Sequence, residues 1–238
     1  MLYFDLLCGA SGDMILASLV DLGVPLSYLQ ECYARLEIPG LKIEQTRKSR
    51  TGRVCTQLAI TWSEDRQREV RNLPAILELL DRGAYRSTVV ATCRRILKRL
   101  AEAESRVHGV AVEQVHFHEI GAVDTVVDVL GFALAIDYLK VDRVLFSTLT
   151  VGSGTIDTGN GRLSVPAPAT RLMLSGFQVR TLDTGTEILT PTGCAILTAR
   201  GRQVSARPEG SLRGEGFGCG QKDIRGFSDY LLVLHLVR

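Results

Sequence analysis

The stretch LYFDLLCGASGDMILASLVDLG, residues 2–23, sets the start of the fold. Leu2 to Cys8 is a short apolar run, which is typical of a buried strand. Gly9-Ala10-Ser11-Gly12 breaks this run, and Ser11 or Asp13 can cap a helix that follows. The apolar face of that helix carries Ile15, Leu19 and Leu22, and Gly23 ends it. The chain is therefore predicted to begin with a strand, a tight turn and a helix.

More helices and a strand pair are predicted up to residue 139. Helical spacing of apolar residues indicates helices over about 27–36, 73–80, 89–107 and 123–139, with Gly109 as a C-cap of the third. Residues 42–62 alternate in the way that two strands do, with a turn near Ser49 to Gly52.

The character of the chain changes near Asp142. Val144 to Val151 is β-like, and Gly152, Gly154, Gly159 and Gly161 separate short strands. Pro166-Ala167-Pro168 and Thr190-Pro191-Thr192-Gly193 each predict the start of a helix, because proline is tolerated in a first turn. Gly214 to Gly220 predicts a tight glycine-rich turn, and Tyr230 to Val237 a final strand.

These elements predict the α+β class, or a mixed α/β layer. The first part is helix-rich and packed with mixed sheets, and the second is rich in strands and glycine. The expected division is 1–142, which contains the candidate metal ligands, and 143–238. One continuous domain is the alternative, since 238 residues allow either arrangement.

The composition is that of an ordinary globular protein, with 45% hydrophobic and 23% charged residues and a net charge of +2. This charge gives no reason to expect a nucleic-acid or membrane partner. The six scattered cysteines predict reduced thiols. Residues 1–5 lack a signal peptide's positive region, and no run approaches the roughly 18 apolar residues of a membrane span. A cytoplasmic location is expected.

One predicted helix carries a row of basic residues. They are Arg94, Arg95, Lys98 and Arg99. A solvated basic face is the preferred interpretation. A nucleic-acid groove is the alternative, and it is disfavoured because no aromatic residues lie between the charges.

The most concentrated set of potential metal ligands is HFHEIGAVDTVVD, residues 116–128. In extended backbone His116 and His118 share a face, and Glu119 can add an oxygen if the chain turns at Gly121. Imidazole with carboxylate suits nickel, zinc, iron or cobalt. A polar edge strand followed by a helix cap is the alternative.

Asp124 and Asp128 are four residues apart, so they share one helix face. Two like charges repel there unless a cation or a basic partner neutralises them. The alternative is an exposed acidic face.

Two segments are candidate nucleotide contacts. Ser11, Gly12 and Asp13 form a helix start that can favour phosphate, although no Lys-Ser/Thr ending makes it a Walker A loop. Thr190, Thr192 and Gly193 can bring backbone close to a ligand. Helix capping and simple turns are the alternatives.

These motifs together resemble the LarC-type nickel-insertion proteins of lactate racemase cofactor maturation. The matching stretches run from Phe4 to Gly220 and are Phe4-Asp5, Ser11 to Met14, Leu19 to Gly23, Ala101 to Glu104, Val107 to Gly109, Val115 to Asp124, Val165 to Thr170, Leu189 to Gly193 and Gly216 to Gly220. The blocks around His116 and Pro166 are highly specific.

The resemblance implies a nickel chelatase, or cyclometallase, of the lyase class. Such proteins insert Ni²⁺ into a pyridinium mononucleotide with two thiocarboxylates, and they consume CTP with Mn²⁺ or Mg²⁺. His116, His118 and Glu119 are then the metal ligands, and Asp124 and Glu119 the catalytic residues, with Asp124 as a base for the ring proton. Ser11, Gly12, Asp13, Thr190, Thr192 and Gly193 are the nucleotide-binding residues, with the phosphate expected on the helix start.

The chain also departs from the family pattern. Residues 66–73 replace a histidine-rich stretch, Asn160-Gly161 replaces His-Gly, and Cys8 stands where serine is common. The C-terminal domain credited with CTP binding is not in this sequence, so CTP and its cation are not expected to bind this chain alone. A separate CTP-binding subunit is one expected partner, and a homo-oligomer is left open. The alternative functions are a non-catalytic module that holds nickel or nucleotide and an unrelated metal-dependent hydrolase.

Overall fold

The computed structural model describes residues 1–63, 72–117, 122–158, 161–224 and 226–237. The helices of this part are α1 (Gly12–Asp21), α2 (Leu26–Ala34), α3 (Leu73–Arg82), α4 (Ser87–His108), η2 (Val112–Gln114), α5 (Ala122–Tyr138), α6 (Pro168–Met173) and α7 (Pro191–Arg200). The strands are β1 (Leu2–Asp5), β2 (Lys42–Arg50), β3 (Arg53–Thr61), β4 (Val144–Phe146), β5 (Leu149–Val151), β6 (Thr155–Thr158), β7 (Gly161–Ser164), β8 (Val179–Thr181), β9 (Arg202–Gln203), β10 (Ser211–Gly218) and β11 (Leu231–Val237). The predicted α+β class is confirmed.

The main sheet has seven strands in the order β2-β3-β10-β11-β1-β4-β9. β1 pairs antiparallel with β11, Phe4 opposite Val233, and parallel with β4, Phe4 opposite Phe146. The remaining strands form two small sheets, β5-β8 and β6-β7. Because the main sheet takes strands from both sides of Asp142, the two expected parts share one sheet; the division into domains stays a prediction.

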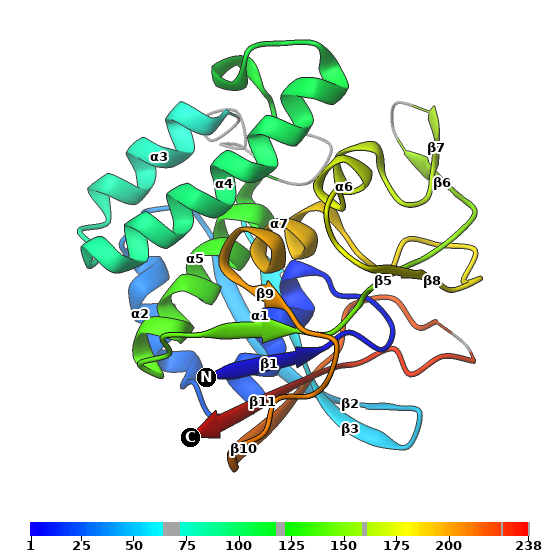
Figure 1. The fold of residues 1–238 in the computed structure, drawn as a ribbon. Helices are drawn as coiled ribbons and strands as arrows, with labels where there is room; N and C mark the ends of the chain where they lie inside the picture. Colours follow the sequence, from blue (N-terminus) through cyan, green and yellow to red (C-terminus); the bar gives the residue numbers. More distant parts are fainter. Residues whose placement is uncertain (64–71, 118–121, 159–160, 225, 238) are drawn as a thin grey trace.

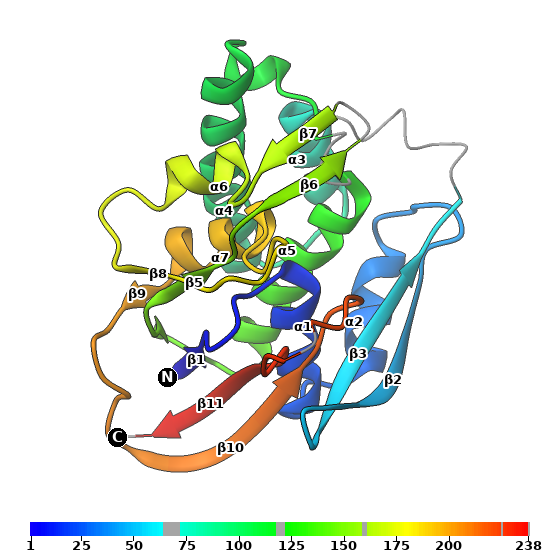
Figure 2. The same cartoon turned by 90° about the vertical axis from the view of Figure 1, so that its right-hand side faces the viewer.

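The helices stack on one face of this sheet (Figures 1 and 2). α1 lies directly on β3, β10 and β11, and α5 packs on α1. α4 forms an outer layer over α5, α6 and α7. Successive side chains of β1 point to opposite faces of the main sheet. Leu2 and Phe4 belong to the main core, and Tyr3 belongs to a small hydrophobic cluster on the other face.

α5 is the central helix, and it is buried along almost its whole length. The Tyr33 hydroxyl on α2 donates a 2.8 Å hydrogen bond to the Val127 carbonyl. Gly131 makes this contact possible, because a Cβ there would lie 2.1 Å from the Tyr33 oxygen. The interpretation of Asp124 and Asp128 as an exposed acidic face is therefore wrong: their helix lies in the core.

One prediction for the second half is corrected, and another gains detail. Gly214 to Gly220 is mostly strand β10, not a tight turn. A Cβ at Gly216 would lie 2.1 Å from the Ser18 carbonyl oxygen, so the glycines serve close packing of α1 on the strand. Val144 to Val151, expected to be β-like, forms the two strands β4 and β5, which belong to different sheets.

Other predictions are confirmed within the described residues. The hairpin β2–β3, the αL cap at Gly109 and the helix starts at Pro168 and Pro191 lie where expected. All six cysteines are buried free thiols. No helix in the described ranges is long and apolar enough to cross a membrane.

Candidate functional site

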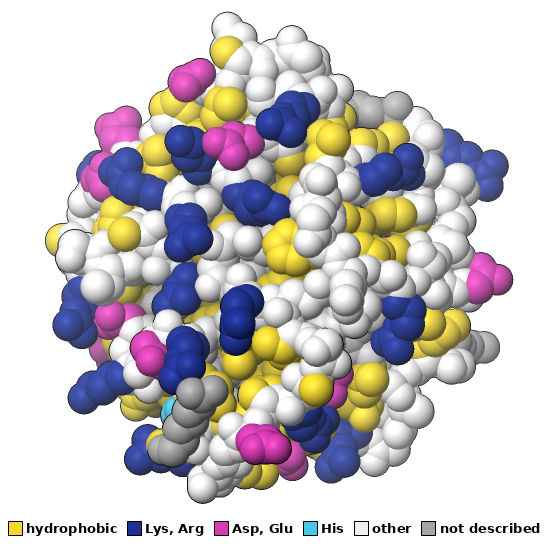
Figure 3. Space-filling model, viewed as in Figure 1, with side chains coloured by type: hydrophobic (Ala, Val, Ile, Leu, Met, Phe, Trp, Pro, Cys, Tyr) yellow, Lys and Arg dark blue, Asp and Glu magenta, His cyan; other side chains and the backbone are white. Residues whose placement is uncertain are grey.

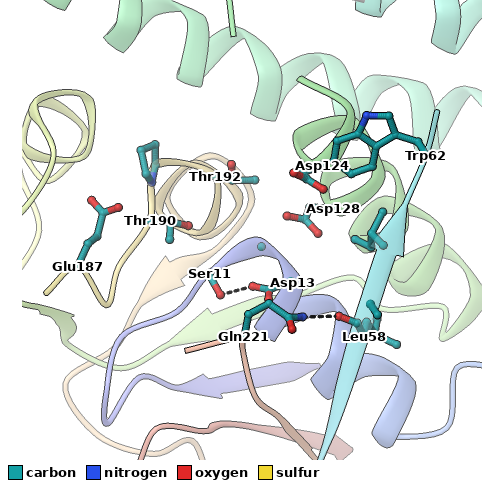
Figure 4. A pocket seen from close by; sticks show the side chains of 14 residues that line it. Ser11, Asp13, Leu58, Trp62, Asp124, Asp128, Glu187, Thr190, Thr192 and Gln221 are labelled. Atoms are coloured by element: carbon teal, nitrogen blue, oxygen red, sulfur yellow. Dashed lines mark hydrogen bonds between the residues drawn. The ribbon is translucent and has the colours of Figure 1, made fainter. Parts of the chain in front are cut away.

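A cavity of about 530 Å³ opens where α1 begins, beside α5, α7 and β3 (Figure 4). Its lining residues come from these four elements and from the loops beside them, and they are Ser11, Gly12, Asp13, Leu58, Ala59, Ile60, Trp62, Asp124, Asp128, Glu187, Thr190, Pro191, Thr192 and Gln221. A cavity of this volume is large enough for a small organic ligand.

The start of α1 forms the floor of the cavity. Ser11 occupies the N-cap position, but its hydroxyl does not cap the helix backbone. It instead donates a short hydrogen bond to Asp13 Oδ1, which also accepts the Met14 N–H at 2.9 Å. The side chain of Asp13 is thus held in one orientation at the helix start.

The start of α7 lies against the start of α1. The Thr190 N–H donates to the Ala10 carbonyl at 3.1 Å, and the Thr190 hydroxyl accepts the Gly193 N–H at 3.2 Å as a true N-cap. Gly193 sits behind the cavity wall, where a Cβ would lie 2.4 Å from the Ala10 carbonyl oxygen. Its role is close packing of the two helix starts, and it does not line the cavity.

α5 contributes two carboxylates to the cavity. Asp124 is half-buried in the first turn, and Asp128 is 6% exposed one turn further on. Asp128 Oδ1 is buried and has no hydrogen-bond partner in the described part of the chain. A buried carboxylate without a partner is costly, so ligand binding or protonation is expected here.

Burial and mutual repulsion change the acidity of these carboxyls. Burial, and next the charge of Asp13, raise the pKa of Asp124 to about 6. Burial, followed by Asp13 and Asp124, raises the pKa of Asp128 well above its ordinary value. Burial also raises the pKa of Asp13, against the hydrogen bond from Ser11. All three carboxyls are therefore weaker acids than exposed aspartates.

Glu187 extends the acidic lining on the opposite side. Burial raises its pKa, while the Ala167 N–H, 3.2 Å away, and Lys222 oppose the shift. No lysine, arginine or histidine is among the residues that line the cavity within the described ranges. The cavity is therefore suited to a ligand that carries positive charge.

Most of the predicted nucleotide and catalytic residues meet here. Ser11, Gly12, Asp13, Asp124, Thr190 and Thr192 all line the cavity. The hydroxyl oxygens of Thr125 and Thr192 are 3.4 Å apart and form a hydrogen bond that links α5 to α7.

Of the three predicted metal ligands, the structure describes only His116. His118 and Glu119 lie outside the described residues. His116 is exposed, forms a β-bridge with Asn72 and does not line the cavity. Over the described ranges, no three His, Cys, Asp or Glu side chains are grouped in a way that could hold a metal ion.

Among the lining residues with polar or aromatic side chains, sequence reasoning missed Trp62, Glu187 and Gln221. Trp62 had a signal, as the only tryptophan of the chain at the end of a predicted strand. Glu187 and Gln221 lie in loops without a motif, so only the fold could place them.

The chain is similar to known proteins over nearly its whole length. The family described as nickel insertion protein matches residues 2–236. The chain is 40% identical over 98% of its length to a protein of Geobacter sp. (strain M21) and 39% over its whole length to one of Geotalea daltonii, both named "Putative nickel insertion protein". A protein of the same name from Pelobacter propionicus is 41% identical over 94% of the chain. The chain spans 57–60% of the length of these three relatives. No solved structure matches the chain significantly.

Proposed function

Because the chain belongs to the nickel insertion protein family, we propose that it inserts Ni²⁺ into a pyridinium mononucleotide with two thiocarboxylates. The product is the nickel-pincer nucleotide used by lactate racemase-type enzymes. The observation that carries this proposal is the buried acidic cavity, in which Asp124 has a pKa of about 6. A carboxyl with that pKa accepts protons at neutral pH more readily than an ordinary aspartate does.

The proposed reaction needs such a base. Nickel forms bonds to the two sulfurs and to one ring carbon, and that carbon loses its proton as the nickel–carbon bond forms. Asp124 takes this proton and then releases it to water. Asp128, buried behind Asp124, adds negative charge or holds a proton of its own.

Nickel is the cargo of this reaction, so its ligands must be labile. We propose His116, His118 and Glu119 as the residues that present it, with Glu119 as a second catalytic residue. Nitrogen and oxygen donors release a borderline metal to the softer thiocarboxylate sulfurs. In sequence, Glu119 is five residues before Asp124, so this motif leads directly into the helix that carries the base.

We assign CTP and its Mn²⁺ or Mg²⁺ to a further part of the protein, present as a separate subunit or in longer relatives. The chain spans 57–60% of the length of those relatives, which leaves the rest of their length for this further part. No step in the cavity is therefore derived from CTP or its cation.

An insertion assay with Asp124→Asn tests the proposal. The chain is mixed with NiCl₂, the bisthiocarboxylate mononucleotide, CTP and Mg²⁺, with and without the C-terminal part of a longer relative, and the nickel adduct is measured by mass spectrometry. Asp124→Asn is expected to lower the rate at least about 100-fold, as loss of a general base does. Asp142→Asn makes the same change at an exposed side chain and serves as the control. An unchanged rate in Asp124→Asn would refute the role of the cavity.

A second candidate is a non-catalytic module that holds nickel or nucleotide for a partner. The departures from the family's histidine pattern at residues 66–73 and at Asn160 favour it. Insertion by the chain without the added C-terminal part would exclude this module.

A further inference from the structure

A second cavity of about 180 Å³ adjoins the acidic one. The two share a wall made by Ser11, Asp13, Glu187, Thr190 and Gln221. A single ligand can therefore extend from one cavity into the other. The chemistry of the two ends differs, and this difference defines what the ligand must be.

The far end of the large cavity combines an aromatic ring with carboxylates. Trp62 follows β3 and lies beside Asp124 and Asp128 (Figure 4). Its Nε1–H is buried, and no described atom accepts a hydrogen bond from it. An indole face opposite carboxylates attracts a flat cation through both cation–π and charge interactions. The face of a pyridinium ring has that chemistry, while the two thiocarboxylates of the proposed substrate, at the ring edge, bind the Ni²⁺.

The small cavity supplies the one lysine among the residues that line the two cavities. Lys222 is exposed and forms no ion pair with a described residue. The preceding residues tie this loop to β3, since Gln221 Nε2 donates to the Leu58 carbonyl at 2.7 Å and Gln57 Nε2 to the Gly220 carbonyl at 2.7 Å. The ammonium of Lys222 is therefore a cation beside the shared wall, and such a cation is suited to a phosphate.

The carboxylates of the small cavity already have partners. Asp229 pairs with Arg50 at 3.1 Å and accepts the Ile224 N–H at 3.2 Å. Glu187 accepts the Ala167 N–H, and Asp13 accepts from Ser11 and Met14. By contrast, the helix start at Ser11 also faces Asp124 and Asp128, which line only the large cavity and repel phosphate. The Lys222 end is therefore the better phosphate position.

We propose that the pyridinium mononucleotide lies across both cavities, with its cationic ring on Trp62 beside Asp124 and Asp128 and its phosphate at Lys222. This inference rests on the proposed function and adds the orientation of the substrate. The ribose then meets the shared wall at Ser11, Thr190 and Gln221. That orientation brings the ring, and not the phosphate, to the base.

Three commercial ligands separate the two ends: nicotinamide mononucleotide, its reduced dihydropyridine form, and nicotinamide riboside. The first has cation and phosphate, the second lacks the cation, and the third lacks the phosphate. Because Trp62 is the only tryptophan, stacking of the first ligand is expected to quench the intrinsic fluorescence. Calorimetry gives the affinities in parallel.

Substitutions at Trp62 and Lys222 test which part of the ligand lies at each end of the two cavities. Trp62→Leu is expected to weaken binding of the mononucleotide by about three- to thirtyfold. The affinity of Trp62→Phe should lie between those of Trp62→Leu and the native chain. Lys222→Gln is expected to weaken the mononucleotide about fivefold and leave the riboside unchanged. Lys98→Gln, on the exposed face of α4, is the control for the loss of one positive charge.

The outcomes are distinct. If the native chain binds none of the three ligands but still forms the nickel adduct in the insertion assay, the function stands and the orientation is overturned; if it does neither, the proposed function itself fails. If it binds the mononucleotide but Trp62 fluorescence and both variants show no effect, the function stands and the orientation is overturned. Circular dichroism of each variant confirms folding, and Trp62→Phe keeps the ring test valid if Trp62→Leu fails to fold.

Discussion

Gly12 lies directly against Asp128: a Cβ on Gly12 would be 2.2 Å from Asp128 Oδ2. The helix start of α1 and the buried carboxylate of α5 therefore fit together only because residue 12 has no side chain. This contact connects the strand–turn–helix start of the chain to its acidic cavity.

Gly12→Ala is expected to push Asp128 out of its position. Since Asp128 is fixed in the core, the free energy of unfolding should fall by about 1–3 kcal/mol, and insertion activity should fall with it. Urea unfolding and the nickel insertion assay measure the two effects. Gly214→Ala is the matched control, because its nearest atom is the flexible Leu22 Cδ1 at 3.2 Å. Equal stability of the two variants would show that the Gly12 contact is not tight.

Asp128→Asn is expected to stabilise the protein at high pH while impairing function. The pKa of Asp128 is raised, so the folded state keeps a proton that the unfolded chain releases above about pH 4. The stability of the native chain therefore falls as pH rises from about 4 through the folded pKa, and it stays low above that pH.

Asp128→Asn has no ionisable group at residue 128, so its stability does not fall with pH in this way. Its advantage should be on the order of 1–3 kcal/mol at pH 8, and it should shrink towards pH 4.5. Urea unfolding at both pH values measures it, with Asp142→Asn as the exposed control. A constant difference between native and variant at the two pH values would argue against a protonated Asp128.

Asp13→Asn is expected to shift the pH profile of nickel insertion. After burial, the charge of Asp13 is what raises the pKa of Asp124 to about 6. Without that charge Asp124 loses its proton at lower pH, so the acid limb of the rate profile should move below pH 6. Rates measured from pH 4.5 to 8 give the shift. A lower rate with an unmoved limb would mean that Asp13 serves only the structure.

The sequence predicted the local elements well, because each had a local signal. The alternation within 42–62 predicted the hairpin, and Thr190-Pro191 predicted the start of α7. It also predicted six of the fourteen residues that line the cavity, through resemblance. It did not predict their burial: the four-residue spacing of Asp124 and Asp128 fits an exposed helix equally well.

Tertiary contacts explain the errors. Gly214 to Gly220 has the composition of a turn, yet its glycines are there because α1 crosses β10 at close range. Nothing near residue 216 in the sequence indicates a helix that lies about 200 residues earlier. Trp62 and Lys222 likewise become neighbours of one site only through the sheet.

Gly216→Ala tests that explanation. A Cβ there would lie 2.1 Å from the Ser18 carbonyl oxygen and 2.6 Å from the Leu22 nitrogen, both backbone atoms of or next to α1. Neither atom can move without displacing the helix, so a loss of about 2–4 kcal/mol in the free energy of unfolding is expected, more than from ordinary overpacking. Gly214→Ala, two residues away on the same strand, should cost far less, because its neighbour is the end of a side chain. Urea unfolding of the two variants side by side measures the difference, and similar stabilities would mean that α1 does not need a glycine at residue 216 of β10.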